Sequence, residues 1–443
     1  MNRMLKTGQK VTAQTSGMSC RIEQFIGAGG QGEVYKAAFA GQPMALKWYF
    51  PSQATSDQES ALETLVSKGA PNDRFLWPLE LASASGVRGY GYIMPLRPSG
   101  YKNIVDLMKR RVEPTFRALA TAGFELADSF KQLHAKGLCY RDINFQNVFF
   151  EPDSGRVLIC DNDNVSVDGA ACCGVLGTPR FMAPEVVRGE TKPDSHTDLF
   201  SLAVLLFYLL MVHHPLEGKK EAAIKAFDLP AMNLIYGREP VFIFDPENDS
   251  NRPVPGYQDN AIAFWPIYPQ FLRDLFTRSF TEGIRDPING RVMECEWRSA
   301  MIRLRDSIVY CPKCASENFY DGEAVRTNGG QLNPCWKCKT SLPVPFRIKV
   351  GKSVVMLNHD TLLYPHHIDD NCGFDFSAPV GEVVRHPKDA NIWGLRNTTG
   401  GNWVCTGTDG TVSDVVPNRT VALRPGIRIG FGKTEGEILH RED

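Results

Sequence analysis

Glycines, a lysine and oxygen-bearing side chains occur between Phe25 and Glu185 in an order that suits phosphoryl transfer. Glycine occupies positions 27, 29, 30 and 32, where backbone N–H groups could approach phosphates without obstruction by Cβ atoms. Phosphoryl transfer needs positioning and compensation of negative charge, which a lysine and Mg²⁺ held by hard oxygen ligands can supply. The side chains that could do this are Lys47, Asp142, Asn147 and Asp161.

The segments that carry these residues match the order of the protein-kinase signature set. They are Gly27-Ala-Gly29-Gly30-Gln-Gly32-Glu-Val34, Met44-Ala45-Leu46-Lys47, Tyr140-Arg141-Asp142 with Asn147, Asp161, and Ala183-Pro184-Glu185. The chain therefore resembles a eukaryotic-like serine/threonine protein kinase. The resemblance implies a bilobal fold that binds ATP and Mg²⁺.

The resemblance implies a role for each catalytic residue. Lys47 would bind the α- and β-phosphates and would be held by a carboxylate on a helix expected over residues 56–68. Glu63 and Glu59 lie on one face of this helix, and the distance to residues 75–78 favours Glu63. Asp142 would accept the proton of the substrate hydroxyl, and two oxygen ligands would hold Mg²⁺. The catalytic set expected is Asp142, Lys47, Glu63, Asn147 and Asp161, with Asn147 and Asp161 as the Mg²⁺ ligands.

The same resemblance implies a nucleotide pocket and three supporting contacts. The Pro95 carbonyl and the Arg97 N–H would bind adenine. Thr178 would bond near Asp142, Glu185 would pair with Arg291, and Asp198 would hold the catalytic loop. The ATP-binding set expected is Gly27, Ala28, Gly29, Gly30, Gln31, Gly32, Val34, Ala45, Lys47, Met94, Pro95 and Arg97.

The sequence also departs from the kinase pattern. Tyr140 replaces the usual histidine and Asn144 the usual lysine, while the triplet Asp161-Asn162-Asp163 stands where Asp-Phe-Gly is expected. None of these changes removes a phosphate, metal or base residue, which favours an active kinase. The alternative is a pseudokinase that binds ATP and acts as an interaction scaffold.

Four cysteines after the kinase region have the spacing of a metal site. They form two C-x₂-C pairs separated by twenty residues, which is typical of a tetrahedral structural zinc site. Disulfides and a redox C-x-x-C are the competing interpretations. The expected Zn²⁺ ligands are Cys311, Cys314, Cys335 and Cys338.

The last hundred or so residues predict short strands separated by glycine, asparagine and proline, as in a small β-sandwich. This tail resembles a forkhead-associated (FHA) domain on residues 350–353, 397–401 and 423–432. Lys352 and Leu363 replace the arginine and serine that read phosphothreonine, which compromises phosphate recognition. A degenerate FHA-like interaction module is favoured over a phosphopeptide reader.

We therefore expect an α+β multidomain chain, in which a bilobal protein-kinase fold is followed by a small zinc ribbon and an all-β FHA-like sandwich. Its 443 residues suffice for two or three domains with separate cores. The expected divisions are an N-terminal segment 1–20, a kinase N-lobe 21–96, a kinase C-lobe 97–309, a zinc ribbon 310–342 and an FHA-like β-sandwich 345–443.

The order of these parts resembles the kinase of the bacterial tellurium-resistance phosphorylation triad. The resemblance includes Phe75-Leu-Trp-Pro78 and the proline-rich stretch 244–253. In that family the kinase is encoded with a von Willebrand A-domain protein and a metal-dependent protein phosphatase. The resemblance therefore implies these two proteins as partners, in addition to protein substrates.

Charge and hydropathy limit the other classes of function. The formal net charge is −1, so nothing favours an electrostatic grip on nucleic acid or on an anionic membrane. The first residues contain no apolar run typical of a secretory signal. The longest apolar stretch, residues 199–212, is too short to cross a bilayer and is expected to be a buried core helix. The sequence thus predicts a cytoplasmic protein.

Overall fold

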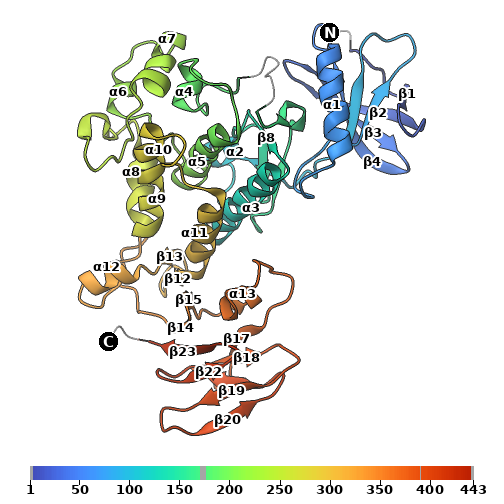
Figure 1. Cartoon of the computed structure of the whole chain (residues 1–443). Coiled ribbons are helices and arrows are strands. Elements are labelled where there is room, and N and C mark those ends of the chain that lie inside the picture. The colour runs from blue at the N-terminus through green and yellow to red at the C-terminus, as the bar shows by residue number, and fades with distance from the viewer. Residues whose placement is uncertain (1–2, 170–175, 390, 441–443) are drawn as a thin grey trace. The chain divides into compact units, whose positions relative to one another are not determined.

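The computed structural model describes residues 3–169, 176–389 and 391–440, and the chain divides into two compact units. The first unit comprises Met1–Phe264 and Asp274–Arg298, and the second comprises Trp265–Arg273 and Ser299–Asp443. Figure 1 shows helices and strands in the first unit and mainly strands in the second. The chain is thus an α+β kinase-like region followed by antiparallel sheets, as the sequence predicts.

The N-terminal lobe of the first unit is a closed barrel of six strands in the order β1-β2-β3-β4-β6-β5. Its strands alternate buried apolar and exposed residues, as expected when one face packs on a core. The strands are β1 (Lys10–Ala13), β2 (Ser19–Ala28), β3 (Gly32–Phe39), β4 (Gln42–Tyr49), β5 (Glu80–Ser83) and β6 (Gly91–Pro95).

The barrel begins earlier than the sequence suggested. Residues 1–20 were expected to be an N-terminal segment separate from the kinase N-lobe, yet β1 pairs with both β2 and β5 of the barrel. Val11 and Ala13 point into the barrel core and Leu5 is buried beside them. Two inward side chains in a four-residue strand are too weak a pattern to detect among polar residues. The strand is stabilised by its pairing with neighbouring strands, which the local sequence does not reveal.

Helix α1 (Ser56–Lys68) lies beside the barrel strands (Figure 1). The Thr55 side chain caps its start by accepting from the Gln58 N–H, and Gly69 ends it with a positive φ of 66°. Leu62 and Leu65 are the buried residues of this helix. Their position fixes which side of α1 turns toward the barrel, and therefore which polar residues turn away.

The C-terminal lobe is built around α3 (Phe116–Ala135) and α5 (Ser195–Met211). A capping box between Asp194 and Thr197 starts α5, and the helix is then buried from Thr197 to Met211. The apolar stretch 199–212 is therefore a core helix, as predicted. Two small sheets belong to the same lobe. One contains β7 (Lys102–Asn103), β9 (Val148–Phe150) and β10 (Val157–Ile159), and the other β8 (Leu138–Cys139) and β11 (Ser166–Val167).

Further helices follow; η4 lies in the second unit, and α9 and α11 each contribute residues to both units. The remaining helices are α2 (Ile104–Met108), η1 (Asn162–Asn164), α4 (Pro184–Val187), α6 (Lys219–Ala222), α7 (Leu229–Met232), η2 (Asn233–Arg238), η3 (Asp249–Asn251), α8 (Asp259–Phe264), η4 (Trp265–Ile267), α9 (Gln270–Phe280), α10 (Glu282–Arg285) and α11 (Glu294–Asp306).

The second unit combines a cysteine-containing segment with two antiparallel sheets. The segment contains β12 (Ile308–Tyr310), β13 (Glu317–Phe319) and α12 (Gly322–Thr327). One sheet has the strand order β15-β14-β23-β22-β19-β20 and the other β16-β17-β18-β21. The strands are β14 (Arg347–Val350), β15 (Ser353–Met356), β16 (Leu362–Leu363), β17 (Gly381–Arg385), β18 (Trp393–Asn397), β19 (Trp403–Thr406), β20 (Val412–Val415), β21 (Thr420–Ala422), β22 (Arg428–Gly430) and β23 (Glu435–Leu439), with helix α13 (Pro365–Ile368) after β16.

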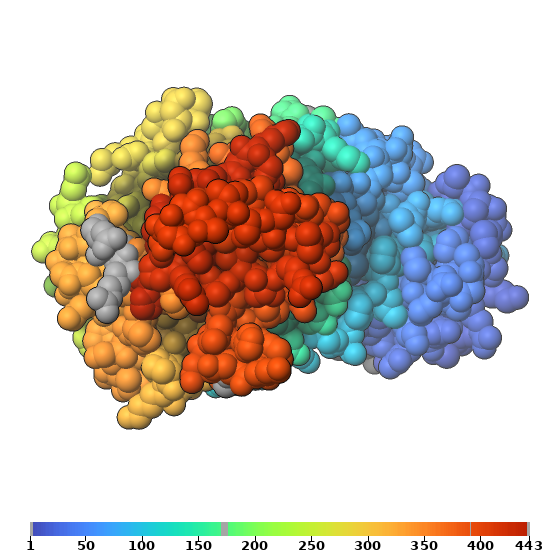
Figure 2. All heavy atoms as spheres, turned by 90° about the horizontal axis from the view of Figure 1, so that it is seen from below, coloured from blue at the N-terminus to red at the C-terminus, as the bar shows by residue number. Residues whose placement is uncertain are grey.

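Buried residues from both sheets form one hydrophobic core, which makes the pair a β-sandwich. Ile348 and Ile438 come from the larger sheet, and Leu363 and Leu395 from the smaller one. These strands are the red atoms of the space-filling view (Figure 2). No helix in the described ranges has both the length and the apolar character required to cross a membrane.

Candidate functional site

The glycine-rich turn between β2 and β3 contains two kinds of glycine. A Cβ built on Gly27, Gly29 or Gly30 would meet nothing within 4 Å. A Cβ on Gly32 would lie 2.2 Å from the Trp48 carbonyl oxygen. The first three therefore leave open space over the turn, which fits the approach of phosphates. Gly32 is required because β3 and β4 pack closely.

Lys47 on β4 is buried and lies among three oxygen acceptors. Its Nζ is 2.7 Å from Asp163 Oδ2, 3.6 Å from Asp161 Oδ1 and 2.9 Å from Gln31 Oε1. Burial lowers the pKa of Lys47, but the two carboxylates more than offset this and hold it above its ordinary value. Lys47 therefore stays a cation at the base of the glycine turn. Gln31 also donates to Asn164 Oδ1 at 3.3 Å.

The structure does not bring Glu63 to Lys47. Glu63 is exposed on α1, and Glu59 is only half-buried. The residue of α1 that reaches the site is Gln58, whose Nε2 donates to the Asp163 carbonyl oxygen at 3.2 Å. The predicted lysine–glutamate pair is thus replaced by a lysine–aspartate pair, because Leu62 rather than Glu63 packs against the barrel residues.

Asp163 was not among the predicted site residues. Its side chain is fully buried, and Lys47 holds its pKa below the ordinary value despite that burial. It accepts hydrogen bonds from the hydroxyls of Tyr49 and Tyr92. The available signal was an acidic residue in place of glycine in the 161–163 triplet, together with two tyrosines on buried strands.

Asp142, Asn147 and Thr178 form the catalytic-loop part of the site. Thr178 Oγ1 donates to Asp142 Oδ1 at 2.8 Å, which is the predicted contact. Asn147 Nδ2 donates to the Asp142 carbonyl at 3.0 Å and to its Oδ2 at 3.3 Å. This leaves Asn147 Oδ1 and the half-exposed Asp161 carboxylate as hard oxygen ligands, a donor set that fits Mg²⁺.

Asn144, the residue that replaces the expected lysine, bridges the same loop. Its Nδ2 lies 3.1 Å from the Asp142 carbonyl oxygen and 3.2 Å from Thr178 Oγ1. It therefore fixes the Asp142–Thr178 pair but supplies no positive charge. Asp161 itself takes a left-handed conformation with φ of 49°.

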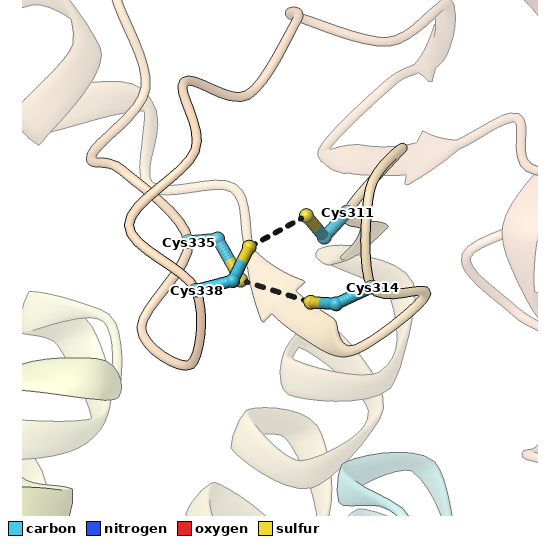
Figure 3. A group of neighbouring side chains, drawn as sticks. All are labelled: Cys311, Cys314, Cys335 and Cys338. Carbon is cyan, nitrogen blue, oxygen red and sulfur yellow. Dashed lines mark hydrogen bonds between the residues drawn. The ribbon is translucent and has the colours of Figure 1, made fainter.

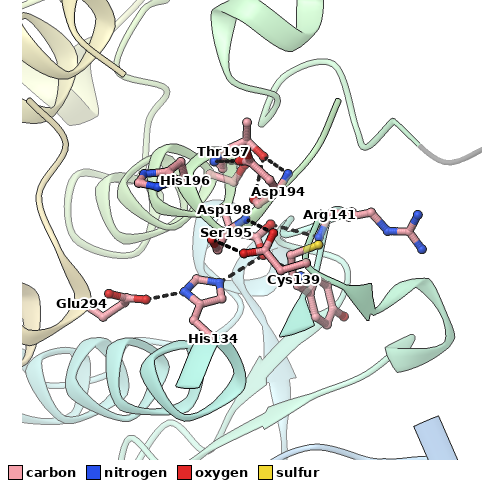
Figure 4. A network of polar contacts seen from close by, with 12 residues as sticks. His134, Cys139, Arg141, Asp194, Ser195, His196, Thr197, Asp198 and Glu294 are labelled. Atoms are coloured by element: carbon pink, nitrogen blue, oxygen red, sulfur yellow. Dashed lines mark hydrogen bonds and ion pairs between the residues drawn. The ribbon is translucent and has the colours of Figure 1, made fainter. Parts of the chain in front are cut away.

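A buried network holds the catalytic loop from α5 (Figure 4). Asp198 accepts the backbone N–H groups of Tyr140 at 2.5 Å and of Arg141 at 2.9 Å, as the sequence predicts. His134 lies between Asp198 and Glu294 and bonds to both. Burial alone would lower the pKa of His134, but these two carboxylates raise it to about 9. Charged His134 thus holds the Asp198 carboxylate in place.

The second predicted support is also present. Arg291 pairs with Glu185 at 2.6 Å, and both side chains are buried. Arg291 also donates to the His196 carbonyl at 2.7 Å, which connects Glu185 to the start of α5. Residues 170–175, in the segment between Asp161 and Glu185, lie outside the described residues.

Three of the residues predicted to bind adenine, Ala45, Met94 and Pro95, lie on the neighbouring strands β4 and β6. Ala45 pairs with Met94 and Met44 with Pro95 in the strand register. Ala45 and Met94 belong to one apolar cluster, against which Val34 packs. The Arg97 guanidinium lies 3.9 Å from the centroid of the Phe149 ring and donates to the Tyr101 carbonyl at 3.0 Å.

The four cysteines predicted to bind zinc come together in the second unit (Figure 3). All four Sγ atoms lie within 4.8 Å of one another. Cys311 and Cys338 are 3.5 Å apart at sulfur, and Cys314 and Cys335 are 3.6 Å apart. Zn–S bonds of about 2.3 Å in a tetrahedron place sulfurs about 3.8 Å apart, whereas a disulfide requires about 2.05 Å. The cluster therefore fits a tetrahedral metal ion and excludes these disulfides.

The two C-x₂-C turns have the same local structure. Ala315 and Lys339, which follow the second cysteine of each turn, both have positive φ, at 56° and 61°. Each of these residues donates its N–H to the carbonyl of the first cysteine at 2.9 Å. The turns thus direct both sulfurs of each pair toward one point. Buried Asn318 bonds on both sides: it donates to the Ser316 carbonyl just after the first turn at 2.9 Å and to Cys335 Sγ of the second turn at 3.7 Å, and it accepts from the Trp336 N–H at 3.1 Å.

The thiols differ in how readily they ionise. Hydrogen bonding with Thr340 lowers the pKa of Cys338 to about 6, and hydrogen bonding with Ser316 lowers the pKa of Cys314. Burial raises the pKa of Cys311 to about 11. A bound cation would supply the charge that favours the thiolate at Cys311.

The protein kinase domain family matches residues 20–264 of the chain. A probable LIM domain-containing serine/threonine-protein kinase of Dictyostelium discoideum is 26% identical over 216 residues, 47% of this chain and 21% of the relative. Mitogen-activated protein kinase kinase kinase 7 of Drosophila melanogaster is 25% identical over 206 residues, 44% of this chain and 29% of the relative. CBL-interacting protein kinase 4 of rice (Oryza sativa subsp. japonica) is 31% identical over 121 residues, 24% of this chain and 26% of the relative. The chain thus spans under a third of the length of these relatives. On the family match and the arrangement of Lys47, Asp142, Asn147 and Asp161, the chain belongs to the protein kinase domain family.

Proposed function

We propose that the chain is an active serine/threonine protein kinase that transfers the γ-phosphoryl group of Mg-ATP to protein hydroxyls, its own included. The observations that carry the proposal are the contacts of Lys47 with Asp161 and with Gln31 of the open glycine turn, and the hydrogen bond between Asn147 and Asp142. Family membership supports it.

Each residue has a chemical task in this proposal. Lys47 binds the α- and β-phosphates, and backbone N–H groups of the glycine turn approach the phosphates from above. Asp161 and Asn147 hold Mg²⁺, which compensates the negative charge of the phosphates when it is bound. Asp142 orients the substrate hydroxyl and accepts its proton, and Thr178 keeps that carboxylate in place.

The test is transfer of labelled γ-phosphate to peptides that are identical except for one serine, threonine or tyrosine. We expect label on the serine and threonine peptides and on the protein, and a rise in melting temperature with Mg-ATP. Stabilisation by Mg-ATP without any label would support the alternative, an ATP-binding scaffold. Label on the tyrosine peptide alone would contradict the serine/threonine assignment.

We further propose that Cys311, Cys314, Cys335 and Cys338 hold one structural Zn²⁺. Four sulfur ligands leave no open position, so the site would stabilise the fold and not catalyse a reaction. A thiolate site of this kind suits a reducing compartment such as the cytoplasm. Elemental analysis should find one zinc per chain.

The finer biological setting is also a proposal. The order of kinase, zinc ribbon and sandwich resembles the kinase of the bacterial tellurium-resistance triad, so we propose a von Willebrand A-domain protein and a metal-dependent phosphatase as partners. The sandwich would act as a degenerate FHA-like interaction module. Co-purification with both candidates, and loss of their phosphorylation when the kinase is inactive, would support this setting. Binding by neither would contradict it.

A further inference from the structure

The ion pair of Lys47 raises the question of which residue positions it for the phosphates. The carboxylate at 2.7 Å is Asp163, which lies two residues after the proposed metal ligand Asp161. The expected partner, Glu63, is exposed on α1. The charge that faces this lysine therefore comes from the 161–163 triplet and not from the helix beside the barrel.

The barrel presents a specific receptor for the Asp163 carboxylate. Lys47 and Tyr49 lie two residues apart on β4 and so share one face of the strand. Tyr92 on β6 is the direct partner of Lys47 in the strand register. Tyr92 donates to Asp163 Oδ1 at 3.2 Å, whereas Lys47 and Tyr49 donate to Oδ2. Both oxygens of the carboxylate are thus engaged, which fixes its orientation.

Helix α1 contacts this receptor through an amide. Gln58 Nε2 lies 3.2 Å from the Asp163 carbonyl oxygen and 3.3 Å from the Tyr49 hydroxyl. The amide holds the backbone of Asp163 and one of the tyrosines that bind its side chain. The helix therefore supports the aspartate but supplies no charge to Lys47.

The backbone explains why a side chain is possible at position 163. The left-handed residue of this segment is Asp161, with φ of 49°, while residues 162–164 form the short helix η1. Position 163 has no positive φ and so does not require glycine. An aspartate can therefore occupy it and direct its carboxylate into the barrel.

We propose that Asp163 is the positioning residue of Lys47 and replaces the glutamate that a kinase usually supplies from this helix. This inference rests on the proposed function, because it concerns how the phosphate-binding lysine is held. Its consequence is that one loop holds both Mg²⁺, through Asp161, and the phosphate-binding lysine, through Asp163. Helix α1 then supports this arrangement through the Gln58 amide and through Leu62, which packs in one buried cluster with Tyr49 and Tyr92.

The experiment measures the affinities of Mg-ATP and of adenosine for Asp163→Asn, Glu63→Gln and the wild type by calorimetry. Adenosine has no phosphates, so it reports on the pocket without Lys47. We expect Asp163→Asn to weaken Mg-ATP about tenfold, the loss of about 1.4 kcal/mol of phosphate binding. Adenosine should bind within about twofold of the wild type, and Glu63→Gln should change neither affinity.

Three other outcomes of the affinity measurements overturn the inference. Equal loss of both ligands in Asp163→Asn would mean that the aspartate merely maintains the pocket. Unchanged Mg-ATP binding would mean that it does not position Lys47, and weakened Mg-ATP binding in Glu63→Gln would return the role to α1. A wild type that binds Mg-ATP but transfers no phosphate would defeat the proposed function only, because the affinity contrast does not require turnover.

Discussion

The phosphate site and the four-cysteine site are assembled over very different distances along the chain. The cysteines come from two short turns with the same backbone structure, and buried Asn318 contacts both. The phosphate site joins the barrel strand of Lys47 to Asp163, 116 residues later. Local spacing therefore determines the four-cysteine site, whereas the phosphate site depends on how α1 and the barrel strands pack. This difference predicts that the two sites respond to different changes.

The largest expected effect is at the cysteines. Replacing Cys311 and Cys314 by serine should abolish zinc binding and unfold the ribbon, because structural zinc sites carry about 10 kcal/mol or more of apparent binding free energy. Met356 of β15 belongs to the same buried cluster as Cys311, so the sandwich should lose stability as well. The matched control is Cys372→Ser at an exposed cysteine.

The first unit should be unaffected by that change. Mg-ATP should bind the double cysteine variant as tightly as the wild type, since the Lys47 site lies in the other unit. Zinc content measured by elemental analysis and ATP affinity measured by calorimetry give the two readouts. A wild-type chain without zinc, or one with a 311–314 disulfide, would refute the metal site.

Substitutions at two glycines of one turn should separate an effect on stability from an effect on Mg-ATP binding. Gly32→Ala would place a Cβ 2.2 Å from the Trp48 carbonyl oxygen and should destabilise the first unit by about 3 kcal/mol. Gly30→Ala meets no atom within 4 Å and should leave the melting temperature unchanged while weakening Mg-ATP binding several-fold. If Gly30→Ala destabilised the protein as much as Gly32→Ala, the open space above the turn would be a misinterpretation.

The His134 network predicts a dependence of stability on pH. The pKa of His134 is raised to about 9, above the value near 6.5 of an unfolded chain, so the charged form stabilises the fold. This stabilisation should be complete below about pH 6.5 and lost as the pH rises through 9, and it should amount to about 3 kcal/mol at most.

The measurement for this prediction is the free energy of unfolding of the first unit as a function of pH, compared with His134→Gln. The advantage of the wild type should shrink between pH 6.5 and 9. A difference that stayed constant over this range would show that His134 does not carry the charge between Asp198 and Glu294.

Much of the fold and of both sites could be predicted from residues at fixed spacing. The cysteine pairs, the glycine turn and the series Asp142, Asn147 and Asp161 each lie within a short segment whose geometry is local. Thr178 and Arg291 could also be paired with their partners, since the kinase resemblance carries those contacts.

The features that the sequence did not predict depend on tertiary packing. The helical pattern of residues 56–68 indicates an apolar stripe but does not tell which flanking polar residue turns toward Lys47, and the structure selects Gln58 over Glu63. The aspartate at 163 was interpreted as the loss of a glycine, although it also adds a carboxylate. Its partner tyrosines come from two different strands, so no single segment of sequence reveals the receptor.

The most direct test of phosphoryl transfer is the mass of the intact protein after incubation with Mg-ATP, compared between the wild type and Asp142→Ala. Loss of a general base lowers rates by about 10²–10⁴-fold. We therefore expect phosphate on the wild type and on the control Asp153→Ala, an exposed aspartate, and none on Asp142→Ala over the same time. Mg-ATP affinity should be retained in all three. Phosphate on Asp142→Ala at the wild-type level, or none on a wild type that binds Mg-ATP, would contradict the assignment of Asp142 and the activity respectively.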